Sequence, residues 1–113
     1  MLIVDDHQEF RRSAAALLEL GGFKVIGEAC DAAEALTNAR AMRPDIVLLD
    51  IHLPDLDGFT VAERIALFED PPVVILVSSR DGSVYRSRLA ASPARGFIAK
   101  RHLSGAALAS LLA

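Results

Sequence analysis

The hydrophobic residues of this chain fall into short apolar runs that alternate with segments of helical spacing. Uninterrupted apolar runs occupy 2–4, 46–49 and 73–77, and each has the composition of a strand covered on both faces of a parallel sheet. Two further strands are expected at 24–29 and 96–99. The pattern therefore predicts five strands.

Helical spacing fills the segments between these strands. A helix is expected over 8–20, where the apolar residues sharing one face are Phe10, Ala14, Leu17 and Leu18. Gly21 and Gly22 supply its C-terminal stop. Asp31, with Glu34 three residues later, has the form of an N-cap, and Pro44 ends that helix by residue 43. Three more helices are expected, over 58–68, from 82 to about 91, and over 105–112.

Strands that alternate with helices throughout are typical of a doubly wound α/β fold with a five-stranded parallel sheet. The 113 residues, 52% of them hydrophobic, are enough for one covered core, and the sequence contains neither a repeat nor a linker. A single domain spanning residues 1–113 is expected, with no output domain in this chain.

Charge and cysteine content narrow the possible functions. A net charge of −3 disfavours direct nucleic-acid binding by this chain. Cys30 is the only cysteine, so neither an internal disulfide nor a cysteine-based zinc site is expected. No segment reaches the roughly 18 consecutive apolar residues of a membrane span, and the N-terminus lacks the basic start of a signal peptide. We expect a cytoplasmic protein with no membrane contact.

Polar side chains follow four of the five expected strands. Asp5 and Asp6 follow the first strand, Asp50 the third, Ser78 the fourth and Lys100 the fifth. Ligands of such sheets bind beyond the carboxyl ends of the strands. One acid in this position is usually a turn former or a helix cap, and Asp6 alone could cap the first helix. Four strands that end this way favour a functional site.

The combination of charges at these strand ends suggests a chemistry. Crowded carboxylates repel one another and require a cation, and oxygen ligands favour Mg²⁺ or Mn²⁺ over zinc. The Lys100 ammonium and the Ser78 hydroxyl add a positive charge and a donor. Together these groups would hold a phosphoryl group, with a carboxylate oxygen of Asp50 as the attacking nucleophile.

The motifs that carry this chemistry resemble the receiver domain of bacterial two-component response regulators. They are Asp-Asp-His at 5–7, Asp50 with Pro54 and Gly58, Ser78, and Gly-Phe-Ile-Ala-Lys at 96–100. The resemblance covers the whole chain and is greatest to receivers of the NarL/FixJ (LuxR) type. It implies a flavodoxin-like sheet with strand order 2-1-3-4-5. It also implies phosphorylation by a sensor histidine kinase, a helix-turn-helix output domain in the full-length protein, control of transcription, and homodimerisation on phosphorylation as an option.

The same resemblance implies individual roles. Asp50 is the expected phosphoacceptor, Lys100 and Ser78 are expected to bind the phosphoryl group, and Phe97 matches an aromatic switch residue. Mg²⁺ is expected on Asp50, directly on Asp6, through water on Asp5, and on the backbone carbonyl of His52. Two alternatives stay open: Ser79 could replace Ser78 if the fourth strand ends one residue later, and Phe97 could be a plain core residue, since it has no hydroxyl.

The sequence departs from the receiver pattern in two places. Pro93 stands where glycine is expected, so the fourth helix should end differently and be short or irregular. His52 and Arg80 border the expected path of an attacking water, and we expect these basic groups to alter phosphoryl lifetime, which a comparison of dephosphorylation in the parent and in Arg80→Ala would test. Several arginines gather near the fifth strand as a solvated face or a partner surface, namely Arg86, Arg88, Arg95 and Arg101. Tyr85, beside them, could join that surface or pack inward.

Two other functions compete with the phosphorylated switch. One is a receiver-fold interaction module that works without phosphorylation. The other is a small metal-dependent phosphatase, which is disfavoured because His52 stands where phosphatases of the haloacid dehalogenase type carry an acid two residues after the nucleophile.

Overall fold

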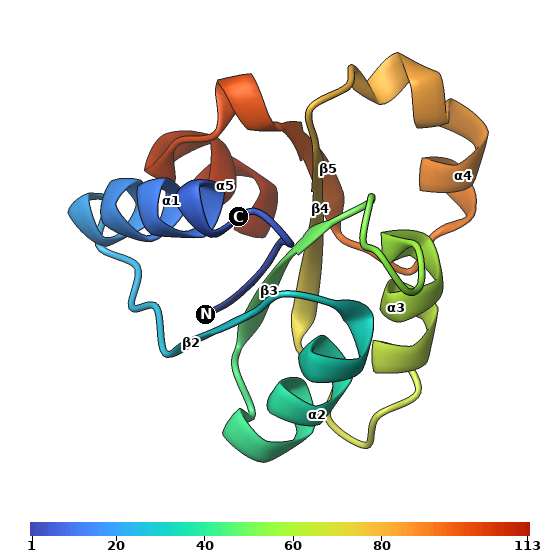
Figure 1. Cartoon of the computed structure of the whole chain (residues 1–113). Coiled ribbons are helices and arrows are strands. Elements are labelled where there is room, and N and C mark those ends of the chain that lie inside the picture. Colours follow the sequence, from blue (N-terminus) through green and yellow to red (C-terminus); the bar gives the residue numbers. More distant parts are fainter.

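A five-stranded parallel sheet forms the centre of the computed structural model, which describes residues 1–113 (Figure 1). Its strands are β1 (Leu2–Val4), β2 (Gly27–Ala29), β3 (Ile46–Asp50), β4 (Val73–Ser78) and β5 (Gly96–Ala99). Their order is β2-β1-β3-β4-β5, and all neighbours are parallel. The predicted fold class and strand order are confirmed.

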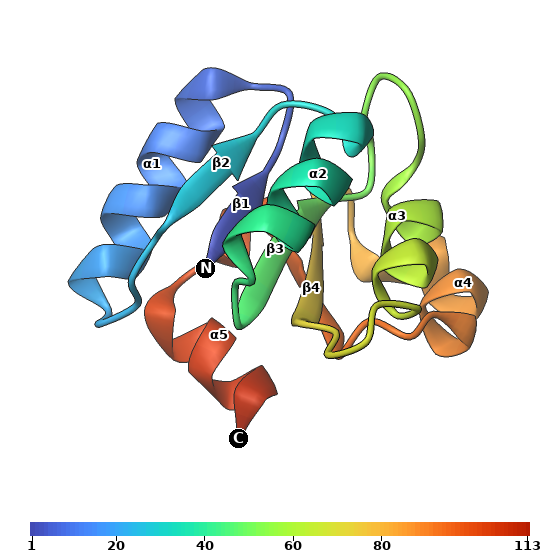
Figure 2. The same ribbon diagram turned by 90° about the horizontal axis from the view of Figure 1, so that it is seen from below.

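Helices cover both faces of the sheet (Figures 1 and 2). They are α1 (Gln8–Leu20), α2 (Ala32–Met42), α3 (Gly58–Ile65), α4 (Arg86–Ala91) and α5 (Gly105–Leu112), with 3₁₀ turns η1 (Gly82–Tyr85) and η2 (Lys100–His102). In Figure 1, α1 and α5 lie on one face, and α2, α3 and α4 on the other. None of the helices combines the length and the apolar character needed to cross a bilayer.

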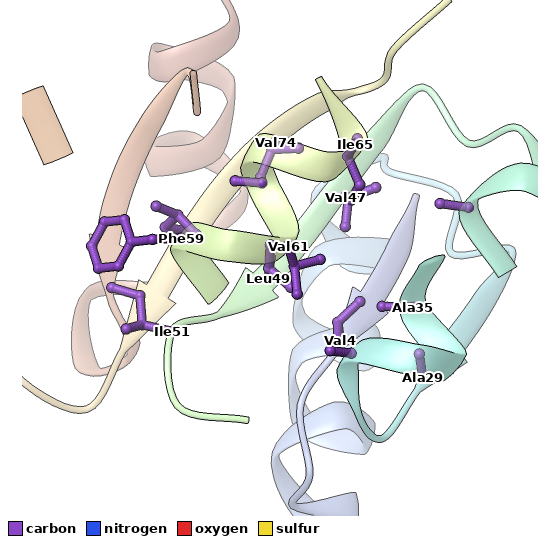
Figure 3. Packing of buried hydrophobic residues seen from close by; sticks show 14 of the residues in the cluster. Val4, Ala29, Ala35, Val47, Leu49, Ile51, Phe59, Val61, Ile65 and Val74 are labelled. Carbon is purple, nitrogen blue, oxygen red and sulfur yellow. The ribbon is translucent and has the colours of Figure 1, made fainter. Parts of the chain in front are cut away.

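The two faces of the sheet explain the uninterrupted apolar runs of the sequence. In β3, Val47 and Leu49 pack beneath α2 and α3, next to Val61 and Ile65 (Figure 3). Leu48, between them, packs on the opposite side with the residues of α1 and α5. All five side chains are fully buried. Because successive strand residues point to opposite faces, a strand covered on both sides needs no polar alternation.

Three local predictions are wrong. The second strand begins at Gly27 rather than at 24, because Gly27 pairs with Leu2, the first residue of β1, and earlier residues have no strand opposite them. Helix α3 ends at Ile65 rather than at 68, where the chain tightens and the Phe68 N–H bonds to the carbonyl of Ile65 at 3.0 Å. Leu17 is 41% exposed, so only part of the predicted α1 face is buried.

The helix boundaries that depend on caps and on proline follow the sequence. The Asp31 side chain accepts a hydrogen bond from the Glu34 N–H at 2.8 Å, which caps α2. α4 has only six residues and ends at Ala91, and the next residue, Ser92, is extended (φ −81°, ψ 145°). Pro93 disfavours the helical conformation for the residue before it. The predicted short fourth helix is confirmed.

Candidate functional site

The carboxyl edge of the sheet brings together the polar residues that follow its strands. β3 and β4 each run one residue further than predicted, so that Asp50 and Ser78 are their last residues. Asp5 follows β1, and its N–H donates to the Ala29 carbonyl of the neighbouring strand at 3.0 Å. Asp5 and Asp50 are the only buried acids of the protein, and Ser78 is buried as well. Asp5 and Asp50 flank the place between β1 and β3 where strand order reverses, as expected for a ligand site, and Ser78 ends the next strand, β4.

Lys100 links the two buried carboxylates. It begins η2, directly after β5, and its ammonium lies 2.5 Å from Asp5 Oδ2 and 3.5 Å from Asp50 Oδ2. The same ammonium stands 4.4 Å from the centre of the Phe10 ring. Asp5 Oδ2 accepts no hydrogen bond, so its contact with Lys100 is that of two charges rather than an aligned donor and acceptor. The Lys100 ammonium is therefore shared by two buried carboxylates.

Asp50 is the most perturbed acid of this site. Burial, and after it the nearby Asp5 carboxylate, raise its pKa to about 6, although Lys100 acts in the opposite direction. The His52 N–H, which donates to Asp50 Oδ1 at 3.2 Å, also favours the ionised form. The site thus holds a carboxylate at neutral pH at a cost in stability, which is a common condition of functional groups.

This pKa shift predicts how stability depends on pH. Between pH values of about 4 and about 6, folded Asp50 binds more protons than unfolded Asp50, so the free energy of unfolding falls as pH rises through this window. Asp50→Asn removes the effect. With a chelator present, we expect the variant to be more stable than the parent above pH 6, and the gap to shrink towards pH 4. Denaturant midpoints at pH 4.5 and 7.5 measure this gap, and equal gaps at the two pH values would contradict the assignment.

Oxygen ligands for a cation gather beside Asp50. Ligand atoms of Asp5, Asp6 and His7 all lie within 4.8 Å of one another. Asp6 does not cap α1, because the N-cap is His7 and makes no capping bond through its side chain. The His7 ring is mostly exposed, but its Nδ1 lies 3.0 Å from a carboxylate oxygen of Asp6 and 3.2 Å from one of Asp5. The buried carboxylate of Asp5 and the exposed carboxylate of Asp6 are oxygen ligands of the kind that suits a hard divalent cation.

Ser78 is held on the other side of Asp50. Its hydroxyl accepts a hydrogen bond from the Arg80 N–H at 3.1 Å and lies 3.1 Å from the hydroxyl of Tyr85. Tyr85 also contacts Nε2 of His52, at 2.5 Å. Ser79 is exposed, and β4 ends at Ser78, so the geometry favours Ser78 over its neighbour.

Tyr85 is the residue whose position the sequence left open. Its ring packs inward and is 7% exposed, next to the ring of Phe97 with centroids 6.2 Å apart. Phe97 itself is half-buried against the core. No motif flags Tyr85, and the helical spacing that includes Leu89 is its only signal in the sequence.

The arginines near β5 do not act as one group. Arg88 pairs with Asp57 at 3.2 Å and stands over the ring of Phe59, while Arg101 pairs with Asp81 at 3.2 Å. The side chain of Arg80 makes no ion pair and is exposed. A solvated face with local ion pairs accounts for these contacts.

Known proteins share both the sequence and the fold. A family profile for the response regulator receiver domain matches residues 1–111. Over 100 residues the chain is 37% identical to the virulence factors putative positive transcription regulator BvgA of Bordetella pertussis, which covers 88% of this chain and 48% of that protein. The signal receiver domain of the putative response regulator NarL from Mycobacterium tuberculosis matches with a TM-score of 0.83 and 34% identity, covering 98% of this chain and 94% of that one.

A ligand-bound structure is also similar. A chain of the CheX-CheY-BeF₃-Mg²⁺ complex from Borrelia burgdorferi matches with a TM-score of 0.81 and 31% identity, over 98% of this chain and 84% of that one. The chain spans about half the length of the curated transcription regulators it matches.

Proposed function

Because this chain belongs to the response regulator receiver domain family, we propose that it is a signalling switch controlled by phosphorylation of Asp50. The observation that carries the proposal is the environment of Asp50. It is a buried carboxylate with a raised pKa, at the end of a central strand, within reach of a lysine ammonium, and Ser78 ends the neighbouring strand.

In this proposal an oxygen of ionised Asp50 attacks the phosphorus of a phosphohistidine on a sensor kinase, or of a small phosphodonor. A new O–P bond forms to give an acyl phosphate, and the bond to the leaving group breaks with its electron pair. Lys100, 3.5 Å from Asp50 Oδ2, turns towards a phosphoryl oxygen, and Ser78 donates its hydroxyl to another. The Asp50 proton is lost before the attack, which a pKa of about 6 permits at neutral pH.

The residues beside Asp50 fit a magnesium ion. Asp5, Asp6 and Asp50 would hold it, together with the backbone carbonyl of His52. When bound, the ion supplies positive charge that offsets the carboxylates and the incoming phosphoryl group. The charges of the site support this assignment, because two buried carboxylates, Asp5 and Asp50, share a single lysine ammonium, and a cation would offset the remaining negative charge.

The expected consequence is a change on the face formed by α4, β5 and α5. Ser78 moves towards the phosphoryl group, and Phe97 with its neighbours responds, which shifts the balance between two arrangements of that face. Similarity to transcription regulators supports a helix-turn-helix output domain in the full-length protein as the recipient. A sensor histidine kinase as donor and a homodimer of phosphorylated chains belong to the same proposal.

Intact-mass spectrometry tests this function directly. Incubation with acetyl phosphate and Mg²⁺ should add about 80 Da, the mass of one phosphoryl group, and the adduct should be lost in hydroxylamine, which cleaves acyl phosphates. Chelation of Mg²⁺ should prevent the gain. A chain that gains no mass, and whose melting temperature does not respond to Mg²⁺, would instead favour the module that works without phosphorylation.

A further inference from the structure

Tyr85 lies where the acceptor site meets α4. It is the last residue of η1, directly before α4, and its ring is enclosed by Phe59, Phe97 and His52 with centroid distances of 5.8, 6.2 and 5.9 Å. The hydroxyl is the only polar part of this side chain, and it reaches two polar groups, His52 Nε2 and Ser78 Oγ. The His52 N–H donates to Asp50 Oδ1, and Ser78 ends the strand β4, which pairs with the strand of Asp50.

The number of protons in this group limits its arrangements. Ser78 Oγ already accepts the Arg80 N–H, and Tyr85 has one proton for two neighbours. If Tyr85 donates to His52, Ser78 must donate to Tyr85. If His52 donates to Tyr85, then Tyr85 donates to Ser78. In both cases a hydrogen bond between Tyr85 and Ser78 fixes the Ser78 hydroxyl.

We propose that Tyr85 is a positioning residue whose hydroxyl holds Ser78 in the resting state and is released when Ser78 turns to a phosphoryl group on Asp50. The inference rests on the proposed function of Asp50. In this proposal the hydroxyl that responds to Asp50 belongs to Tyr85, directly before α4, and not to the residue at position 97. Phe97 has no hydroxyl, and the ring of Tyr85 packs against it.

His52 provides a second link between Asp50 and Tyr85. Its N–H bonds to Asp50 Oδ1 at 3.2 Å while its ring contacts the Tyr85 hydroxyl. A change in the charge of Asp50 therefore reaches Tyr85 by two short routes, one through the His52 backbone and one through Ser78. Tyr85 in turn is continuous with α4, so release of its hydroxyl frees the first turn of that helix.

The composition of the chain makes this residue observable. Tyr85 is the only tyrosine, and there is no tryptophan, so the intrinsic fluorescence of the protein reports the surroundings of this one ring. Beryllofluoride with Mg²⁺, which mimics an acyl phosphate, should change the tyrosine emission of the parent. The same addition to Ser78→Ala should change the emission less, because that variant has no Ser78 bond to release and keeps only the route through His52.

Binding affinity gives the decisive measurement. We expect Tyr85→Phe to bind beryllofluoride about two- to tenfold more tightly than the parent, since one restraining hydrogen bond no longer opposes binding. In the Ser78→Ala background, Tyr85→Phe should change the affinity by less than about twofold.

Each alternative result has a clear meaning. Equal or weaker binding by Tyr85→Phe would overturn the proposal, and so would an equal gain in the Ser78→Ala background. A parent that binds no beryllofluoride would contradict the function of Asp50 and the release step together. The bond between Tyr85 and Ser78 in the resting state is tested without ligand, by denaturant unfolding of both single variants and the double variant. The effects of Ser78→Ala and Tyr85→Phe on the free energy of unfolding should be non-additive. Additive effects would show that the Tyr85 hydroxyl does not hold Ser78.

Discussion

Asp50→Asn is expected to abolish phosphoryl uptake. The amide has no nucleophilic oxygen anion, and no other acid of the site is placed to replace it, because Asp5 is engaged by Lys100 and Asp6 is exposed at the rim. Incubation with acetyl phosphate and Mg²⁺ should leave the intact mass of the variant unchanged while the parent gains about 80 Da. The fold should persist, since asparagine has nearly the same shape and removes a buried charge.

Asp45→Asn provides the matched control for this loss. Asp45 directly precedes β3, so the same substitution is made at the opposite end of the same strand, at an exposed position. This variant should take up a phosphoryl group as the parent does. Uptake by Asp50→Asn equal to that of Asp45→Asn would mean that another residue accepts the phosphoryl group.

Gly58→Ala should be the most destabilising single methyl addition near the site. A Cβ on Gly58 would collide with the carbonyl oxygen of Asp50 and stand 2.8 Å from Cα of Ile51. Both are backbone atoms of the segment that holds the acceptor, and the Gly58 N–H also bonds to the Ile51 carbonyl at 2.7 Å. Because this backbone cannot move aside without displacing Asp50, we expect a loss of about 3 kcal/mol or more in the free energy of unfolding. Denaturant unfolding monitored by circular dichroism measures it.

Gly27→Ala is the matched comparison. Its Cβ would also be crowded, at 2.5 Å, but by the sulfur of Met42, the flexible end of a partly exposed side chain. That side chain can rotate away, so the loss should be less than about 1 kcal/mol. If the two variants unfolded at the same denaturant concentration, the close approach of α3 to the end of β3 would not carry the stability assigned to it here.

The central elements of the fold are predictable because their signals are local and redundant. Apolar runs define β3 and β4, and a cap with a proline defines α2. The family profile and the fold also agree with the resemblance to receivers of the NarL type. The start of β2 was predicted wrongly because it depends on the neighbouring strand. β2 begins at the residue that pairs with Leu2 of β1, and no local pattern in the sequence encodes this pairing.

The acidic, serine and lysine residues of the site are predictable for a different reason. They end parallel strands, and parallel strands that end together must place those residues at one edge. The roles of these residues remain proposals. Tyr85 could not be found this way, because it ends a 3₁₀ turn rather than a strand, and its hydroxyl meets Ser78 and His52 only through tertiary packing. The position of the His7 ring likewise depends on a side-chain conformation that the sequence does not determine.

The shortness of α4 affects the free energy that is needed to change its conformation. None of its six residues is buried, and Leu89 is its only side chain packed against the core. Segments with little buried apolar surface open locally at a small fraction of the free energy of global unfolding. A ligand shifts such an equilibrium only by its difference in affinity for the two states. When the two conformations of a segment differ little in free energy, a change in a few contacts is therefore enough to shift their populations. In the proposed switch, the proline that cuts this helix short would therefore also let a single phosphoryl group shift the conformation of α4.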